Sequence, residues 1–183
     1  MRVIAGSAKG KRLKSPKGST RPTTELVRGA IFSILQSVVG NECQILDLYA
    51  GSGALGIEAL SRGASWADFV ESDPKCCAII KENLALTGFT GRARVYCCSV
   101  NKALSKLDAL YDVVVLDPPY SDLSLARTLE ALLGSQLVGS DSIVVVQCST
   151  HQPLPSEIEQ FQLLKSRHYG DTCLSIYRQE ANN

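Results

Sequence analysis

Two kinds of apolar pattern alternate along this chain. Apolar residues that recur every three or four positions predict helices with one buried face, and short unbroken runs of β-branched and aliphatic residues predict buried strands. The predicted helices run from Thr23 or Thr24 to about Val39 and then over residues 55–62, 75–86, 101–107 and 123–133. The predicted strands cover residues 45–49, 67–71, 93–98, 113–116, 143–146, 160–168 and 172–178.

This order of elements predicts an α/β fold. Strands that alternate with helices of about ten residues form a parallel sheet with helices on both faces. The last two strands flank a tight turn at Tyr169, Gly170 and Asp171, so they must run antiparallel to each other. Residues 2–5 and 11–14 flank Gly6 and Gly10 and predict a β-hairpin. We therefore expect a basic N-terminal arm over residues 1–22 and one globular domain over residues 23–183.

Charge is distributed unevenly along the 183 residues, although the net charge is only +1. Residues 1–28 hold eight of the 19 Lys and Arg residues and a single acidic residue, Glu25. A basic arm on an acidic body favours a polyanionic partner, although a solvated arm that only aids solubility stays possible. The candidate RNA-binding residues are Lys9, Lys11, Arg12, Lys14, Arg21 and Arg28.

The seven cysteines do not have the spacing of a metal site. Cys76-Cys77 and Cys97-Cys98 are directly adjacent, whereas paired zinc ligands are usually two to four residues apart. We interpret the cysteines as small apolar residues in a reducing cytoplasm and expect no metal. No apolar run has the length of a membrane span, and no apolar segment follows the basic N-terminus as in a secretory signal.

A glycine-rich turn follows the first strand of the domain, in the order Asp47, Leu48, Tyr49, Ala50, Gly51, Ser52, Gly53. Glycines at such a turn let a ligand approach the backbone closely. A carboxylate at the strand end suits a ligand with a positive ammonium group better than it suits a pyrophosphate. The turn therefore favours S-adenosylmethionine, with Asp47, Tyr49, Gly51 and Gly53 at its site, over a plain turn between strand and helix.

Two further strand ends are candidates for the same ligand. Glu71 ends the second strand, where an acid can bind both ribose hydroxyls, while Asp73 lies before Pro74 and is the better helix cap. Ser99 and Val100 follow the third strand, where a side chain and a backbone amide could bind adenine. On spacing alone, an ordinary strand exit explains Ser99 and Val100 equally well.

The loop formed by Asp117, Pro118, Pro119 and Tyr120, here called the Asp-Pro-Pro-Tyr loop, follows the fourth strand. An aromatic amino group is a weak nucleophile because its lone pair is delocalised into the ring. Acceptors on its two N–H bonds favour a pyramidal nitrogen, and the Asp117 carboxylate and the Pro118 carbonyl can supply them. Two prolines stiffen the loop, and Tyr120 offers a face on which a flipped base can stack. The loop predicts methylation of a planar amino nitrogen.

These residues together resemble the bacterial family that methylates guanine N2 in 16S ribosomal RNA. The resemblance runs nearly end to end and is carried by residues 1–6, 21–24 with Arg28, 47–62, 69–73, 117–120, 169–172 and 174–177. It implies a class I methyltransferase fold, a Rossmann-like seven-stranded sheet with an antiparallel last strand. It also implies that S-adenosylmethionine is the cofactor, and that Thr23, Thr24 and Arg28 lie near the cofactor or the RNA.

The chain departs from this family at two places. The family usually has an acid after the arginine at position 28, where this chain has Gly29, and its fifth strand commonly ends in Glu-His, where this chain has Gln147 and Cys148. If the groups at these positions help to hold the substrate, the departures change the affinity for the base or the choice of base. The residues of the cofactor turn are intact.

Three other functions fit parts of the pattern. An adenine-N6 nucleic-acid methyltransferase shares the Asp-Pro-Pro-Tyr loop, but residues 121–183 contain no insertion for reading duplex bases. A non-catalytic RNA-binding module has no need of the loop, and the basic arm favours RNA over a protein glutamine as substrate. We expect a cytoplasmic monomer that acts on 16S ribosomal RNA, free or in a small-subunit assembly intermediate, without a membrane or a metal.

Overall fold

One mixed sheet forms the centre of the computed structural model, which describes residues 1–16, 24–37, 42–152 and 154–179. In the described residues the sheet has eight strands in the order β3-β2-β1-β4-β5-β8-β7-β6. Their bounds are β1 Gln44–Leu48, β2 Trp66–Glu71, β3 Ala93–Cys97, β4 Val113–Leu116, β5 Ile143–Ser149, β6 Glu157–Ile158, β7 Phe161–Tyr169 and β8 Thr172–Gln179.

The strand directions confirm the predicted topology. Strands β1 to β5 run parallel to one another, whereas β8 runs antiparallel between β5 and β7. The expected number of seven strands was wrong by one, because the two-residue β6 adds an edge strand that pairs with β7. Two residues are too few to produce an alternating pattern in the sequence. Strand β5 also extends to Ser149, beyond its apolar run, because β8 pairs with it as far as Thr172.

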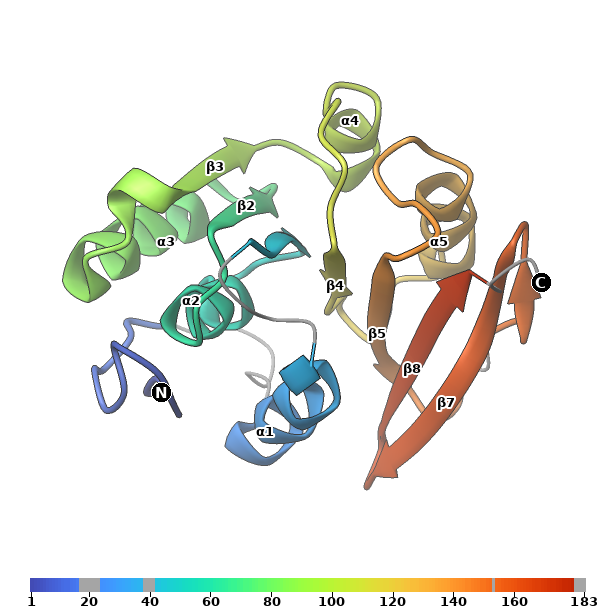
Figure 1. The fold of residues 1–183 in the computed structure, drawn as a ribbon, viewed down its shortest axis with the longest axis horizontal. Helices are drawn as coiled ribbons and strands as arrows, with labels where there is room; N and C mark the ends of the chain where they lie inside the picture. Colours follow the sequence, from blue (N-terminus) through green and yellow to red (C-terminus); the bar gives the residue numbers. More distant parts are fainter. Residues whose placement is uncertain (17–23, 38–41, 153, 180–183) are drawn as a thin grey trace.

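The helices cover both faces of the sheet (Figure 1). Their bounds are α1 Glu25–Ile34, α2 Ala54–Ser61, α3 Pro74–Thr87, α4 Val100–Leu104 and α5 Leu125–Leu133, with short 3-10 helices η1 Leu35–Ser37 and η2 Thr90–Arg92. Helices α1, α2 and α3 pack on one face, and α4 and α5 pack on the other. Thr24 caps α1 by accepting a hydrogen bond from the Val27 amide, so the predicted start of this helix is confirmed. Part of its predicted end, residues 38 and 39, lies outside the described residues.

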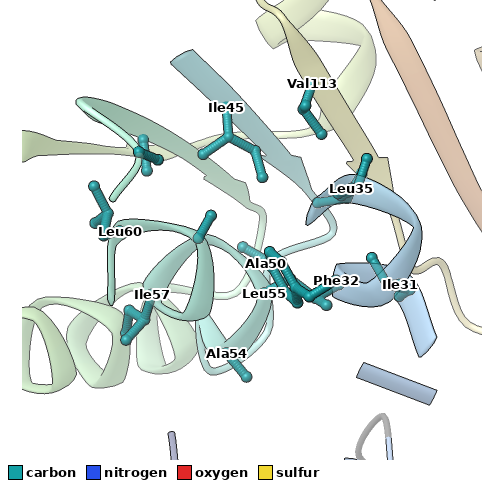
Figure 2. Close-up of a cluster of buried hydrophobic side chains, with 14 of the residues drawn as sticks. Ile31, Phe32, Leu35, Ile45, Ala50, Ala54, Leu55, Ile57, Leu60 and Val113 are labelled. Carbon is teal, nitrogen blue, oxygen red and sulfur yellow. The ribbon is translucent and has the colours of Figure 1, made fainter. Parts of the chain in front are cut away.

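Alternate residues of each strand separate the interior into two clusters. Ile45 and Val113 point to the side of α1 and α2, where they join Ile31, Phe32 and Leu55 (Figure 2). The residues that alternate with them pack against α4 and α5 on the opposite face. Both faces of the central strands are therefore buried, so the ends of these strands are where a polar ligand can bind.

Residues 1–16, here called the N-terminal segment, pack against α2. Arg2 and Arg12 form an isolated antiparallel bridge between the two arms of the predicted hairpin, and the amides of Val3 and Leu13 donate across it to the carbonyls of Lys11 at 3.0 Å and Met1 at 2.9 Å. The backbone amides of Ile4 and Ala5 donate to the Glu58 carboxylate at 2.8 and 3.0 Å. Val3, Ala8 and Leu13 of the segment are buried in the same cluster as α2. The segment is thus anchored to the domain, and the predicted division after residue 22 falls outside the described residues.

Five of the seven cysteines are buried, as expected of small apolar residues. Cys97, the last residue of β3, is exposed, and Cys98, which follows it, is partly exposed. No helix in the described part of the chain is long and apolar enough to cross a membrane.

Candidate active site

A cavity of about 690 Å³ lies at the carboxyl ends of the parallel strands. The predicted site residues that line it are Thr24, Asp47, Tyr49, Gly51, Glu71, Asp117, Pro118 and Tyr120. They come from segments that are far apart in the sequence but end at the same edge of the sheet. The cavity therefore brings the glycine-rich turn and the Asp-Pro-Pro-Tyr loop together, as the parallel topology requires.

The turn between β1 and α2 holds Asp47 at the base of this cavity. The Gly56 amide of α2 donates to Asp47 Oδ2 at 2.8 Å. Gly51 and Gly53 both have positive φ angles, of 56° and 77°. Gly53 does not line the cavity, because it packs inward, where an added Cβ would lie 3.1 Å from Ile80 and 3.2 Å from the Phe69 ring. This glycine therefore allows close packing at the start of α2, and its contact with the cofactor stays a prediction.

The charge around Asp47 determines which ligands the cavity can bind. Its side chain is 1% exposed, and Oδ1 has no hydrogen-bond partner in the described residues. Burial raises the pKa of Asp47 well above its usual range, the hydrogen bond from Gly56 opposes this, and the negative charges of Asp117 and Glu71 raise the pKa further. An unpaired carboxylate oxygen among carboxylates calls for a positively charged donor, so these residues fit the ammonium and sulfonium groups of S-adenosylmethionine.

Tyr49 follows β1 with a left-handed backbone, at a φ of 61°. A bulky residue rarely adopts this conformation, which costs of order 1–3 kcal/mol and is typical of functional sites. Its hydroxyl donates to Asp122 Oδ2 at 3.0 Å, and burial raises its pKa. Tyr49 lines the main cavity and a second cavity beside it, so it stands between the two.

Glu71 and Asp73, the two acids that the sequence offered for the ribose, have different positions. Glu71 lines the main cavity and accepts from the amides of Gly51 at 2.8 Å and Asp73 at 2.9 Å. Asp73 caps α3 by accepting from the Lys75 amide at 2.8 Å. The hydrogen bonds to Glu71 fix its carboxylate toward the glycine-rich turn, where the remaining lone pairs can accept ribose hydroxyls.

Ser99 and Val100 do not line the main cavity. They line the second cavity, of about 200 Å³, together with Tyr49, Glu71 and Ser72. These three residues also line the main cavity, so the two adjoin. The Ser99 hydroxyl accepts from the Lys102 amide at 3.4 Å. The position agrees with the predicted adenine subsite.

The Asp-Pro-Pro-Tyr loop forms the wall of the main cavity opposite the glycine-rich turn. Pro118 is buried, whereas Tyr120 is 40% exposed at the rim. The Pro119 carbonyl accepts from the Asp122 amide at 2.9 Å. The hydroxyls of Tyr120 and Thr172 are hydrogen-bonded, which ties the loop to the start of β8. At the other end of the loop the Asp117 amide donates to the Leu48 carbonyl at 3.4 Å, so the loop is held at both ends, as a rigid pair of acceptors requires.

Comparison with known proteins places the chain among relatives of the same length. The family described as Conserved hypothetical protein 95 matches residues 1–178. The chain belongs to this family.

Two sequence relatives and one solved structure show how close the similarity is. The Bacillus subtilis protein YlbH is 37% identical over 182 residues, which cover 97% of this chain and 98% of the relative. Ribosomal RNA small subunit methyltransferase D of Escherichia coli K12 is 32% identical, with coverages of 99% and 91%. The solved structure of Escherichia coli yhhF, named as a methyltransferase, has a TM-score of 0.89 at 30% identity and covers 100% of this chain and 99% of its own. The fold is that of the class I methyltransferases.

The predicted RNA-binding residues of the N-terminal segment lie on the surface. Lys9, Lys11, Arg12 and Lys14 are exposed. Lys11 Nζ donates to the Leu86 carbonyl at 3.1 Å and to the Thr87 carbonyl at 3.3 Å, at the end of α3, and Lys14 pairs with Glu82 at 2.8 Å. Lys9 and Arg12 therefore stay the better candidates for phosphate contacts. Thr23 and Arg21 lie outside the described residues.

Arg28 is not on the surface, and its expected contact with RNA is wrong for this structure. Its side chain is 0% exposed, since its position on α1 faces inward with Val27 and Ile31. Nη2 donates to the Arg2 carbonyl at 3.0 Å. Burial lowers the pKa of Arg28, and the nearby Glu58 carboxylate opposes this. Arg28 therefore connects α1 to the N-terminal segment.

Several cavity residues were not expected from the sequence. Asp171 and Thr172 line it from the start of β8, and Met1, Ser15, Pro16, Val27, Cys76 and Gln147 also line it. The turn at residues 169–172 carried part of the family resemblance, so Asp171 and Thr172 had a signal. Gln147 had a signal as well, because it is one of the departures from the family. Ser15, Pro16 and Cys76 had none, because their places depend on packing between distant segments.

Proposed function

We propose that this protein transfers a methyl group from S-adenosylmethionine to the exocyclic N2 amine of a guanine in 16S ribosomal RNA. The observation that carries the proposal is a cavity that joins Asp47, whose Oδ1 has no partner in the described residues, to the Asp-Pro-Pro-Tyr loop. The relative in Escherichia coli K12 is named for methylation of small-subunit ribosomal RNA, which supports the choice of substrate. The family resemblance of the sequence supports guanine N2.

The cofactor would bind along the glycine-rich turn. Asp47 and Gly51 would hold its aminoacyl end, Glu71 its ribose, and Ser99 and Val100 its adenine. S-adenosylmethionine supplies a methyl carbon on a positively charged sulfur, which keeps the bonding electron pair when the carbon is transferred. The carboxylates in the cavity favour this positive charge electrostatically.

The Asp-Pro-Pro-Tyr loop would orient the target amine. The Asp117 carboxylate and the Pro118 carbonyl accept its two N–H bonds and turn the nitrogen lone pair toward the methyl carbon. As the nitrogen–carbon bond forms, the amine gives one proton to Asp117. This side chain is only partly buried, so the proton can pass on to solvent. Tyr120, at the rim, would stack on the flipped base.

The N-terminal segment would contribute phosphate contacts from Lys9 and Arg12. In this proposal the protein works in the cytoplasm as a monomer, on free 16S RNA or a small-subunit assembly intermediate, and the Asp-Pro-Pro-Tyr chemistry requires no metal.

Substitution of Asp117 tests the proposal. The measurement is transfer of labelled methyl groups to small-subunit RNA from a strain that lacks this activity, with S-adenosylmethionine affinity measured by calorimetry. We expect Asp117→Ala to lower kcat by roughly a hundredfold or more while the cofactor affinity survives. Asp117→Asn keeps an acceptor oxygen but takes no proton, so its loss should be smaller. Turnover close to that of the wild type in Asp117→Ala would disprove this role.

A further inference from the structure

Gln147 presents a buried, unpaired acceptor to the main cavity. The residue stands near the end of β5 and is 6% exposed. Its Oε1 has no hydrogen-bond partner in the described residues, and the side chain lines the cavity. Buried polar atoms in native proteins nearly always have a partner, and an unmatched one needs an explanation. A ligand that donates a hydrogen bond to Oε1 would supply one.

The pairing of the strands places Gln147 beside the group that would hold the amine. Leu116 of β4 pairs with Val146 of β5, so the next residues, Asp117 and Gln147, stand level on adjacent strands. Adjacent strands lie about 4.8 Å apart, and paired residues of a parallel ladder point to the same face. Gln147 therefore lies one strand away from Asp117.

The other neighbour of Gln147 confirms which face it occupies. Gln147 pairs with Leu174 of β8, and Leu174 belongs to the cluster that packs against α1 and α2. Asp47 projects toward the same side, because Ile45, two residues before it, belongs to that cluster as well. One face of the sheet thus carries Asp47, Asp117 and Gln147 toward one cavity.

We propose that Gln147 is a specificity-determining residue whose Oε1 accepts the N1–H of the target guanine, an inference that rests on the proposed function. When the loop holds the N2 amine, the next atom along the base edge is the ring nitrogen N1. In guanine N1 carries a hydrogen. In adenine the ring nitrogen beside the exocyclic amine is an acceptor, and so is that of cytosine. The same glutamine amide can donate from its nitrogen to O6, which makes the pair bidentate.

This contact discriminates by the number of hydrogen bonds that form. A base with an acceptor beside its amine either places two lone pairs against each other or makes the amide rotate, and then only one of the two hydrogen bonds forms. Sites built to hydrogen-bond a substrate N–H reject analogues that lack it far more strongly than apolar pockets reject a missing methylene. Gln147 would thus favour guanine over adenine, although the Asp-Pro-Pro-Tyr loop by itself accepts the amine of either.

The experiment compares base analogues in glutamine variants. The nucleotide that the wild type methylates is first located in the RNA by transfer of a labelled methyl group. Guanosine or 2-aminopurine is then placed at that position by ligation. The assay uses the form of the RNA, free or assembled, that the wild type methylates. 2-Aminopurine keeps the 2-amino group but lacks N1–H and O6. The quantities measured are kcat/KM for each RNA and the affinity for S-adenosylmethionine, in the wild type, Gln147→Met and Gln147→Glu. Gln44→Met is the matched control, because Gln44 is exposed at the start of β1.

We expect the wild type to prefer guanosine by roughly a hundredfold. Gln147→Met should lower kcat/KM for guanosine by about tenfold to a hundredfold and leave that for 2-aminopurine unchanged. Gln147→Glu keeps an acceptor and should retain part of the preference, and Gln44→Met should behave as the wild type. Cofactor affinity should be the same in all four proteins, which also shows that they fold.

Two results would overturn the inference. One is an equal loss on both RNAs in Gln147→Met, and the other is weaker cofactor binding by that variant, which would assign Oε1 to the cofactor. Failure of the proposed function gives a different result, since the wild type would then label no guanine in RNA at all.

Discussion

Replacing Asp47 with asparagine should make the protein more stable and its cofactor binding weaker. Asp47 is buried, and its Oδ1 has no partner in the described residues. The charges of Asp117 and Glu71 oppose its ionisation, which adds to the effect of burial in raising its pKa. The asparagine oxygen can still accept from Gly56, and the amide group carries no charge.

The expected size follows from the unpaired oxygen. An unsatisfied buried polar group costs roughly 1–3 kcal/mol, and more when it is charged. Part of this is regained in Asp47→Asn, so we expect the free energy of unfolding without cofactor to rise by about 1 kcal/mol at neutral pH. Affinity for S-adenosylmethionine should fall about tenfold or more, which corresponds to about 1.4 kcal/mol for each factor of ten.

The pH dependence gives an independent check. Because the pKa of Asp47 is raised in the folded protein, the native state keeps this proton to higher pH than the unfolded chain does. Its contribution to stability is fully present below the ordinary value of 3.8 and is lost as the pH rises through the raised pKa. The wild type and Asp47→Asn should therefore have similar stabilities in acid, and the variant should gain its advantage as the pH rises.

Urea unfolding, followed by the fluorescence of the single tryptophan, measures the free energies of unfolding of the wild type and Asp47→Asn between about pH 4 and pH 8. Asp68→Asn is the matched control. Asp68 is buried in β2, but both its oxygens are paired, with Trp66 Nε1 at 2.9 Å and the Tyr111 hydroxyl at 2.6 Å. The free energy of unfolding of Asp68→Asn should be lower than that of the wild type by roughly 1–3 kcal/mol. An Asp47→Asn protein that is less stable than the wild type at neutral pH would refute the reasoning.

Two predictions concern the N-terminal segment. Glu58→Ala should lower the free energy of unfolding by roughly 3–5 kcal/mol, because it leaves two backbone amides unpaired and Arg28 buried without its nearby carboxylate. Glu82→Ala breaks only an exposed ion pair, so its free energy of unfolding should fall by about 1 kcal/mol or less in the same urea titration. Equal losses in the two variants would contradict the argument from the burial of Glu58. Replacing Lys9 and Arg12 together by glutamate should weaken RNA binding and flatten its dependence on salt, since two phosphate contacts disappear; an unchanged slope in a filter-binding titration would remove both from the RNA interface.

The sequence predicts the strands and the chemistry of the site better than it predicts which distant residues come together there. Unbroken apolar runs such as Val113–Leu116 identify buried strands, because only the centre of a parallel sheet buries both faces. The Asp-Pro-Pro-Tyr loop follows such a run, so its place at the sheet edge follows as well. The pairing of Gln147 with Leu174 could not be predicted, because it depends on β8 inserting between β5 and β7.

Arg28 shows a second limit of charge patterns. An arginine in a basic stretch is ordinarily exposed, and local sequence gives no sign that this one is buried. Its burial depends on Glu58 and on the Arg2 carbonyl, which the fold brings to it from distant positions. The left-handed backbone of Tyr49 is likewise invisible in the sequence, since it is imposed by the packing around the turn.

The most direct test of the central claim is the identity of the methylated nucleoside. The protein is incubated with labelled S-adenosylmethionine and with small-subunit RNA or particles from a strain that lacks this activity, and the RNA is digested to nucleosides and separated. The account predicts that the label is found in N2-methylguanosine, and that Asp117→Ala lowers its rate of formation by roughly a hundredfold or more. Label in N6-methyladenosine, or no label in RNA, would contradict it.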